Sequence, residues 1–515
     1  MTLEITRRTL IGGLGAAALA APAILHGQML FNAYPFRLGV ASGDPTPDGF
    51  VLWTRLAPDP LADGGGVPMA PIGVDWAVAS DPGFKAVVQK GTAIARPELA
   101  HSVHVEVTGL LPDRPYWYRF MVGRDRTLLG RTRTLPLPGA NVRALKFAVA
   151  GCQNYEDGLF TAFRHMAAED VDFVFHYGDY IYEDRWRPKD PGHDGRPRPT
   201  VRPHIGDKPF STDDYRRRYA QYKLDGDLQA AHAAAPWWTT FDDHEVEDNW
   251  VGLEDKYDTP AAVFRLRRAA AFQAWYEHSP VRAGMIPGPT GIAMHRRARY
   301  GTLLDAHFLD TRQYRTNQPC DDDFKPDCPA VTDPKAQVLG TEQEAWLARS
   351  LGGKRARWNC LAQQVMMMRL DRRTGDTVVP IRNMDSWAGY MTPRERLLER
   401  CRGLGNVVVL TGDEHQNFAG ELATAKGETV AVEFVGTSIS AGGDGGDVRR
   451  DAAEVRSHNP QLKFSNDQRG YLICSVTPDR WETRFRVMDR VTVAGEVSTR
   501  AVATVEHGVA GVVMG

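Results

Sequence analysis

Short apolar runs that end in glycine alternate with amphipathic stretches over most of the chain after residue 145. The segments ALKFAVAG, VDFVFHYG and NVVVLTG are nearly continuous apolar runs, typical of strands buried on both faces. FTAFRHMAAEDV and TEQEAWLARSLGG instead space their apolar residues along one face of a helix. Towards the C-terminus, TVAVEFVG, GYLICSV and RWETRFRVM predict antiparallel strands. The pattern predicts an α/β layered fold over residues 145–505.

Residues 36–135 follow a different pattern, in which β-forming residues alternate or cluster between Pro, Gly and Asp. FVLWTRLA, VDWAVAS, HSVHVEV and PYWYRFMVG are the clearest such segments. VTGLLPDRPYWYRF resembles the same region of fibronectin type III sandwiches. A chain of 515 residues exceeds what one core usually supports, so two domains are expected. We predict an N-terminal all-β, immunoglobulin-like or fibronectin III-like domain over residues 36–135, with LPLPGANV as the linker to the second domain.

The first 23 residues predict a targeting signal rather than folded structure. The pair Arg7-Arg8 precedes a short apolar run and the small-residue site Ala21-Pro22-Ala23. The apolar run is too short to span a bilayer, and no later segment is long or apolar enough to be a transmembrane segment. We therefore expect residues 1–23 to be a twin-arginine signal peptide, read by the twin-arginine export machinery, and the mature protein to be periplasmic or secreted.

The net charge and the positions of the cysteines argue against several classes of function for this protein. The net charge of -2 provides no polycationic field, so we expect no nucleic-acid-binding surface. The six cysteines include no CxxC pair, which argues against a zinc ribbon or a thioredoxin-like site. Cys320 and Cys328 bracket the polar loop CDDDFKPDC, and export to an oxidising compartment predicts a disulfide between them. We expect the protein to be a monomer.

Side chains that can bind metals follow four predicted strands, ALKFAVAG, VDFVFHYG, NVVVLTG and PWWTTF. Ligand sites in α/β sheets gather beyond the carboxyl ends of strands, so we expect these side chains at one centre. They are Cys152 in GCQ, Asp179 and Tyr182 in GDYIYE, Asp243, His244 and Asn249 in DDHEVEDNW, and Asp413 and His415 in GDEH.

The residue types at these positions indicate which ions they would hold. Carboxylates and the Asn249 carbonyl suit hard cations, whereas the thiolate of Cys152 suits softer or borderline ones. A phenolate from Tyr182 favours a trivalent ion such as iron(III), and a bridging Asp179 would let two or more ions share the site. Five acids crowd into TTFDDHEVEDNW, which is costly unless cations lie among them. Asp242, Glu245, Glu247 and Asp248 are either ligands or supporting or solvated groups, and the sequence leaves both open.

The ordered motifs GCQ, GDYIYE, DDHEVEDNW and GDEH, behind a twin-arginine signal and a β-domain, resemble the PhoD-type alkaline phosphatases. More distantly they resemble the purple acid phosphatases among the metallophosphoesterases. The resemblance covers nearly the whole mature chain and implies a metallophosphoesterase-like α/β layered sandwich as the catalytic domain. One departure is GDEHQN, which has a single histidine where many metallophosphoesterases have Gly-His-x-His. That departure fits an oxygen-rich, calcium-containing centre.

The resemblance also implies a role for each motif residue. Cys152 and Tyr182 would ligate iron(III), Asp179 would bridge the metals, and Asp413 and His415 would complete the metal shell, with calcium as the partner ion. Asp243 occupies the asparagine position of the superfamily's Asn-His pair, with His244 beside it near the phosphate. Asn249 would be a further oxygen ligand.

The expected reaction is hydrolysis of a phosphate ester by a metal-bound hydroxide that attacks phosphorus. Arg312, in LLDAHFLDTRQYR, could contact phosphate oxygens through its guanidinium fork, with a surface salt bridge as the alternative. Two other functions stay open. One is a phosphodiesterase or phospholipase D-like activity of the same fold, since fold alone does not separate monoester from diester substrates. The other is a calcium-dependent binding protein, which Cys152 and Tyr182 argue against.

Overall fold

A computed structural model describes residues 31–184, 200–351 and 356–515 of the chain. The predicted twin-arginine signal, residues 1–23, lies outside the described residues. Within the described ranges, no helix combines the length and apolar character that crossing a membrane requires. The predicted disulfide between Cys320 and Cys328 is present.

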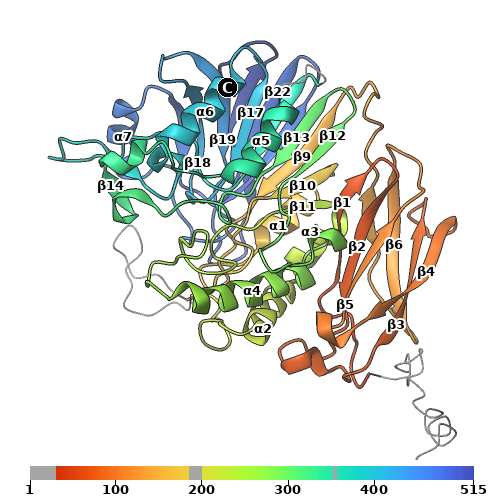
Figure 1. The fold of residues 1–515 in the computed structure, drawn as a ribbon. Helices are drawn as coiled ribbons and strands as arrows, with labels where there is room; N and C mark the ends of the chain where they lie inside the picture. The colour runs from red at the N-terminus through yellow and green to blue at the C-terminus, as the bar shows by residue number, and fades with distance from the viewer. Residues whose placement is uncertain (1–30, 185–199, 352–355) are drawn as a thin grey trace, which may run out of the picture.

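Two large mixed sheets form the centre of the molecule (Figure 1). The first sheet has ten strands, and its middle strands β9, β10 and β11 are parallel neighbours. In spatial order these strands are β24 (Val513–Met514), β23 (Val497–Glu506), β22 (Arg480–Met488), β21 (Gly470–Val476), β9 (Leu145–Ala150), β10 (Phe173–His176), β11 (Trp237–Thr239), β1 (Val40–Thr46), β2 (Gly49–Arg55) and β5 (Ser102–Val107).

The second sheet has seven strands and packs against the first. Its four middle strands β13, β15, β17 and β19 are parallel, and β19 is antiparallel only to its other neighbour β18. The spatial order is β12 (Arg296–Tyr300), β13 (Leu304–Phe308), β15 (Trp358–Ala362), β17 (Val407–Thr411), β19 (Thr429–Val435), β18 (Asn417–Ala423) and β20 (Leu462–Asn466). A short ribbon of β14 (Phe324–Pro326) and β16 (Ile381–Asn383) lies outside both sheets.

Helices cover the outer faces of the two sheets, giving an α/β/β/α layered arrangement. One apolar core lies between the sheets and includes Phe147, Phe175, Leu410 and Phe434. A second core lies between the ten-stranded sheet and the first four helices, and a third lies between the seven-stranded sheet and α5 and α6. The helices are α1 (Thr161–Ala167), α2 (Thr212–Lys223), α3 (Gly226–Ala234), α4 (Ala261–His278), α5 (Gly340–Leu351), α6 (Met391–Cys401) and α7 (Ala452–His458). The strands and helices predicted from the apolar pattern after residue 145 are thus confirmed.

The N-terminal region is all-β, as predicted, and shares a sheet with the rest of the chain. Strands β4 (Val87–Ala95), β3 (Ile72–Ala79), β6 (Pro115–Val122), β7 (Asp125–Arg126) and β8 (Gly130–Arg133) form a separate five-stranded sheet. This sheet packs across an apolar core onto β2 and β5, and β1 pairs in parallel with β11 at Gly43 and Trp237. The region, red and orange in Figure 1, therefore completes the ten-stranded sheet at one edge.

Candidate metal centre

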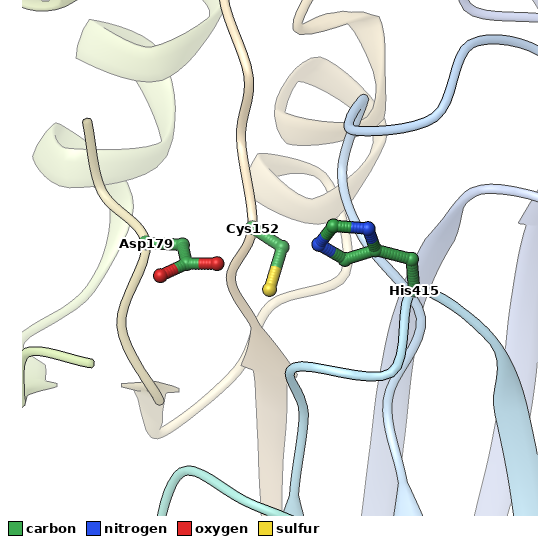
Figure 2. Close-up of side chains that lie close together, drawn as sticks. All are labelled: Cys152, Asp179 and His415. Atoms are coloured by element: carbon green, nitrogen blue, oxygen red, sulfur yellow. The ribbon is translucent and has the colours of Figure 1, made fainter. Parts of the chain in front are cut away.

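The predicted ligands lie where the parallel strands of both sheets end. Cys152 follows β9, Asp179 follows β10 and Asp243 follows β11, and these three strands are neighbours in one sheet. Asp413 and His415 follow β17 of the facing sheet. Because the carboxyl ends of parallel strands meet at one edge, segments far apart in the sequence converge there. Figure 2 shows Cys152, Asp179 and His415 turned towards one another from three separate segments.

The backbone at these positions adopts a conformation that ordinary residues avoid. Cys152, Asp179, Asn249, Asp413 and His415 have φ angles of 53°, 54°, 54°, 68° and 52°. Left-handed backbone costs a non-glycine residue roughly 1–2 kcal/mol, and such residues cluster at functional sites. Five of the seven predicted metal ligands thus lie in sharp turns. Four of these five, Cys152, Asp179, Asp413 and His415, belong to groups whose ligand atoms lie close together.

Glycines before the ligand turns let the strand ends approach one buried ring. A Cβ on Gly151 or on Gly412 would lie 2.1 Å from Cε2 of Tyr177. The ring is fully buried, and its hydroxyl donates to the carbonyl of Thr437 at 2.5 Å. Tyr177 is therefore wedged between the two strand ends that carry Cys152 and Asp413, which fixes the spacing of the two sheets at the centre.

Three overlapping groups of side chains have ligand atoms within 4.8 Å of one another, and Asp179 belongs to all three. The first group contains a thiol, a carboxylate and an imidazole, and the other two are mainly or wholly oxygen donors. They are Cys152, Asp179 and His415; Asp179, Asp243 and His244; and Asp179, Asp242, Asp243 and Asp413. The shared position of Asp179 is the one that a bridging ligand requires.

Tyr182 joins the first group through its hydroxyl. This hydroxyl donates to Asp179 Oδ2 at 2.9 Å and lies 3.0 Å from Nε2 of His415. Burial, together with the negative charges of Asp179 and Cys152, raises the pKa of the phenol well above its usual value. A cation among these groups would favour the opposite, ionised form.

The buried acidic groups of the centre would be stabilised by a positive charge among them. Burial and neighbouring acids raise the pKa of Cys152, Asp179 and Asp413 well above their usual values. Buried polar atoms are nearly always hydrogen-bonded, yet one carboxylate oxygen of Asp179, of Asp242 and of Asp243 has no hydrogen-bond partner among the described residues. Unsatisfied oxygens beside a buried thiol, phenol and imidazole are a donor set that fits bound metal ions.

Other acids of the TTFDDHEVEDNW segment have partners of their own. Glu245 accepts hydrogen bonds from the backbone N–H groups of Asp179, Tyr180 and Asp242 at 3.1, 2.6 and 2.9 Å. Glu247 is buried and forms ion pairs with the partly exposed Lys208 and the buried Arg267. Glu245 therefore shapes the ligand turns, and Glu247 is neutralised by protein cations.

His244 is held by a carboxylate that the sequence reasoning did not single out. Its Nδ1 lies 2.7 Å from Oε2 of Glu183, which is fully buried and also accepts from the backbone of Asp248 at 2.9 Å. Burial opposes the charge on His244, but Glu183, Asp243 and Asp179 outweigh it and raise the pKa of the imidazole well above its usual value. The ring also packs on Tyr182, with centroids 4.1 Å apart. The only signal in the sequence was the final acid of GDYIYE.

Arg312 lies inside the centre rather than at the surface, so the alternative of a surface salt bridge is wrong. Its side chain is fully buried. Nε donates to Asp242 at 2.5 Å, Nη1 donates to Asp385 at 2.9 Å, and Nη2 lies 3.4 Å from Asp243. Nη2 has no hydrogen-bond partner among the described residues. Contact with phosphate through that nitrogen stays a prediction.

Asn249 lies at the margin of the centre. Its backbone N–H donates to Asp243 Oδ2 at 2.8 Å, which ties it to a predicted ligand. The side-chain amide nitrogen donates to Asp322 at 2.8 Å. Its role as an oxygen ligand stays a prediction.

Comparisons with known proteins agree with this architecture. The family described as PhoD-like phosphatase matches residues 147–485, and the N-terminal domain of the same family matches residues 20–136. Alkaline phosphatase D of Bacillus subtilis (strain 168) is 47% identical over 478 residues, which cover 92% of this chain and 81% of that protein.

Solved structures extend the comparison to the fold. A structure of PhoD superimposes with a TM-score of 0.90 at 46% identity, covering 94% of this chain and 93% of that one. A purple acid phosphatase from yellow lupin (Lupinus luteus) seeds superimposes with a TM-score of 0.54 at 12% identity, covering 91% of this chain and 74% of that one. The second likeness is one of fold alone. Together with the sequence matches, these findings show that the chain belongs to the PhoD-like phosphatase family, a family of phosphoric-ester hydrolases.

Proposed function

We propose that this protein is an exported alkaline phosphatase of the D type whose centre holds iron(III) and calcium. One observation carries the metal assignment. The Cys152 thiol, the Asp179 carboxylate and the His415 imidazole have ligand atoms within 4.8 Å of one another, and the Tyr182 hydroxyl is 2.9 Å from Asp179 and 3.0 Å from His415. Sulfur, nitrogen and phenol donors together suit iron(III) far better than calcium or magnesium.

The remaining donors suit calcium. Asp179, Asp242, Asp243 and Asp413 supply only carboxylate oxygens, which hard cations prefer. Bound cations would supply acidified water as the nucleophile and positive charge for the phosphoryl oxygens. Other residues of the chain hold the ligands in position. Glu245 accepts hydrogen bonds from the backbone of Asp179 and Asp242 and so fixes the turns that carry them. Arg312 limits the repulsion among the acids through Asp242 and Asp243.

His244 is the proposed proton carrier. Glu183 accepts from Nδ1, so that nitrogen is a donor and Nε2 is the ring atom left to act on the substrate. A ligand atom of His244 also lies within 4.8 Å of ligand atoms of Asp179 and Asp243, so the ring is beside the proposed metal site. From this place a protonated Nε2 could donate to the oxygen that leaves phosphorus.

The proposed function is tested by metal content and a paired assay. The mature protein is purified through its native export route, and iron, calcium and zinc are quantified by mass spectrometry. A phosphate monoester and a diester are then compared as substrates. Iron with calcium and faster monoester hydrolysis are expected. Faster diester hydrolysis would instead identify a phosphodiesterase, and calcium alone without turnover of either ester would overturn the proposal.

A further inference from the structure

Asn249 forms three hydrogen bonds with residues from different parts of the chain. Its backbone N–H donates to Asp243 at 2.8 Å, and its backbone carbonyl accepts from Gln318 Nε2 at 2.7 Å. Its side-chain nitrogen donates to Oδ2 of Asp322 at 2.8 Å. The φ angle of 54° completes a local conformation that these contacts together impose.

The contact with Asp322 decides which way the amide of Asn249 faces. An ionised carboxylate only accepts hydrogen bonds, so the amide atom next to Asp322 must be the nitrogen. The amide is planar, and its carbonyl oxygen therefore points away from Asp322. Calcium takes oxygen ligands only, so an amide flipped about its last bond would present the wrong atom.

The segment that carries Asp322 is closed by a covalent link. The disulfide between Cys320 and Cys328 joins residues eight positions apart. Within this loop, Cys320, Asp321, Asp322 and Asp323 have φ angles of 60°, 63°, 60° and 64°. Four successive non-glycine residues in the left-handed region are strongly disfavoured in a free chain. The link restricts the loop's alternatives and so favours this conformation.

Two further contacts anchor the loop beside the centre. The backbone N–H of Met384 donates to the carbonyl of Asp323 at 3.0 Å, and β14 pairs with β16 just beyond the loop's turn. The second oxygen of Asp322, Oδ1, is buried and has no hydrogen-bond partner among the described residues. Asp322 is therefore held in place by its loop rather than by a partner for each of its oxygens.

We infer that Asp322 is a positioning residue for the calcium ligand Asn249, and that the Cys320–Cys328 disulfide keeps it in place. Calcium affinity at the centre then depends on a disulfide that contributes no ligand. This inference rests on the proposed function, which takes calcium as the ion, and on the predicted role of Asn249 as one of its oxygen ligands.

The first test is calcium affinity, measured by titration calorimetry on the full-length mature protein after removal of calcium by EGTA. Asp322→Ala should weaken calcium binding by about 10–100-fold, the usual effect of removing a group that orients a metal ligand. Asp322→Asn can still offer a carbonyl oxygen to Asn249 and should lose much less. Asp323→Asn is the matched control, since that side chain is exposed in the same loop and its backbone contact is kept.

An exchange of the two side chains separates positioning from general damage. Asn249→Asp alone places two carboxylates where the wild type has a hydrogen bond of 2.8 Å, and it should weaken calcium binding. Adding Asp322→Asn restores a donor and an acceptor in reversed order, with an oxygen still free for the ion. The double variant should therefore bind calcium more tightly than Asn249→Asp alone.

The disulfide is tested with Cys320→Ser combined with Cys328→Ser. This variant should bind calcium more weakly than the wild type while keeping its iron, and excess calcium should restore its phosphatase activity. Unchanged calcium affinity in both Asp322→Ala and the double serine variant would overturn the inference. If the wild type binds no calcium, the metal assignment itself is wrong, and that result is distinct from the first.

Discussion

At the scale of the residue, Glu183 shows how a buried carboxylate can hold a histidine ring in place. Its two carboxylate oxygens accept from His244 Nδ1 and from the backbone of Asp248. Lys208 approaches Glu183 to 3.9 Å, too far for a hydrogen bond. Glu183 therefore acts through His244, as a group that fixes the orientation and the donor nitrogen of the ring.

Replacing Glu183 by Gln should slow the reaction without removing the metals. The charge that holds the protonated ring is lost, so proton donation to the leaving oxygen weakens, and kcat should fall by about 100-fold. The loss should be larger for an alkyl phosphate than for 4-nitrophenyl phosphate, whose leaving group needs no proton. Asp184→Asn serves as the control, and equal losses on both substrates would contradict the assigned role.

Lys223 provides a second prediction at the same scale, because no carboxylate among the described residues pairs with it. Its ammonium lies 4.3 Å from the centre of the Trp53 ring and 5.1 Å from that of Tyr180. Burial lowers the pKa of Lys223 from its usual value near 10.5 to about 7. The unfolded chain then binds a proton that the folded chain lacks between these two pH values, so stability attributable to this group rises with pH.

Lys223→Met should therefore be more stable than the wild type at pH 6, by about 2–4 kcal/mol, and should lose that advantage by about pH 10. The measurement is the difference in melting temperature between the two proteins across this range. If the difference in melting temperature does not change with pH, burial does not destabilise the charged form of Lys223 in the folded protein.

At the scale of the element, the strands and the ligands at their ends are the features that the sequence could predict. Runs such as residues 145–150 and 407–411 could be predicted as strands because strands buried on both faces are made mostly of apolar side chains. The ligands that follow them could be predicted because ligand sites in α/β sheets gather beyond the carboxyl ends of strands. Glu183 and Asp322 were missed because their roles depend on His244 and Asn249, 61 and 73 positions away. The pairing of β1 with β11 likewise joins residues whose proximity no local pattern encodes.

Gly412 tests how closely the two sheets must approach at the centre. In Gly412→Ala the added Cβ would lie 2.1 Å from the Tyr177 ring, so the ring or the turn that carries Asp413 must move. Overpacking of this kind typically costs about 1–3 kcal/mol. We expect a lower melting temperature together with reduced metal content. Combining it with Tyr177→Leu, which removes the clashing ring atoms, should recover part of both, and no recovery would mean that the clash lies elsewhere.

At the scale of the whole molecule, the buried acids of the centre predict that the stability of the fold depends on bound cations. Acids from both sheets meet at one edge and have like-charged neighbours, so they repel one another when no cation is bound. A ligand that binds only the folded state adds about 2.7 kcal/mol when present at 100 times its dissociation constant. Metal ions bound at the centre would therefore link the two sheets energetically, because their ligands come from both sheets.

Chelation should lower the melting temperature of the whole protein rather than of one part. We expect EDTA to lower the melting temperature. Added calcium should restore it in protein that still contains its iron. Calorimetry with and without the chelator measures it, and the Asp179→Ala variant should show a smaller response because its shared ligand is missing. An unchanged melting temperature in EDTA would show that bound cations do not stabilise the fold.

The junction between the N-terminal region and the ten-stranded sheet has a consequence for how such proteins can diversify. Besides the pairing of β1 with β11, Trp53 donates to the carbonyl of Glu277 at 2.9 Å, and Arg55 lies 2.8 Å from His278 at the end of α4. Recombination that exchanged residues 36–135 between relatives would have to carry a matching end of α4 with them. Free variation is left to the far sheet, where β4 and β7 lie at the outer edges. We therefore expect residues 36–135 to be exchanged only together with the end of α4 that they contact.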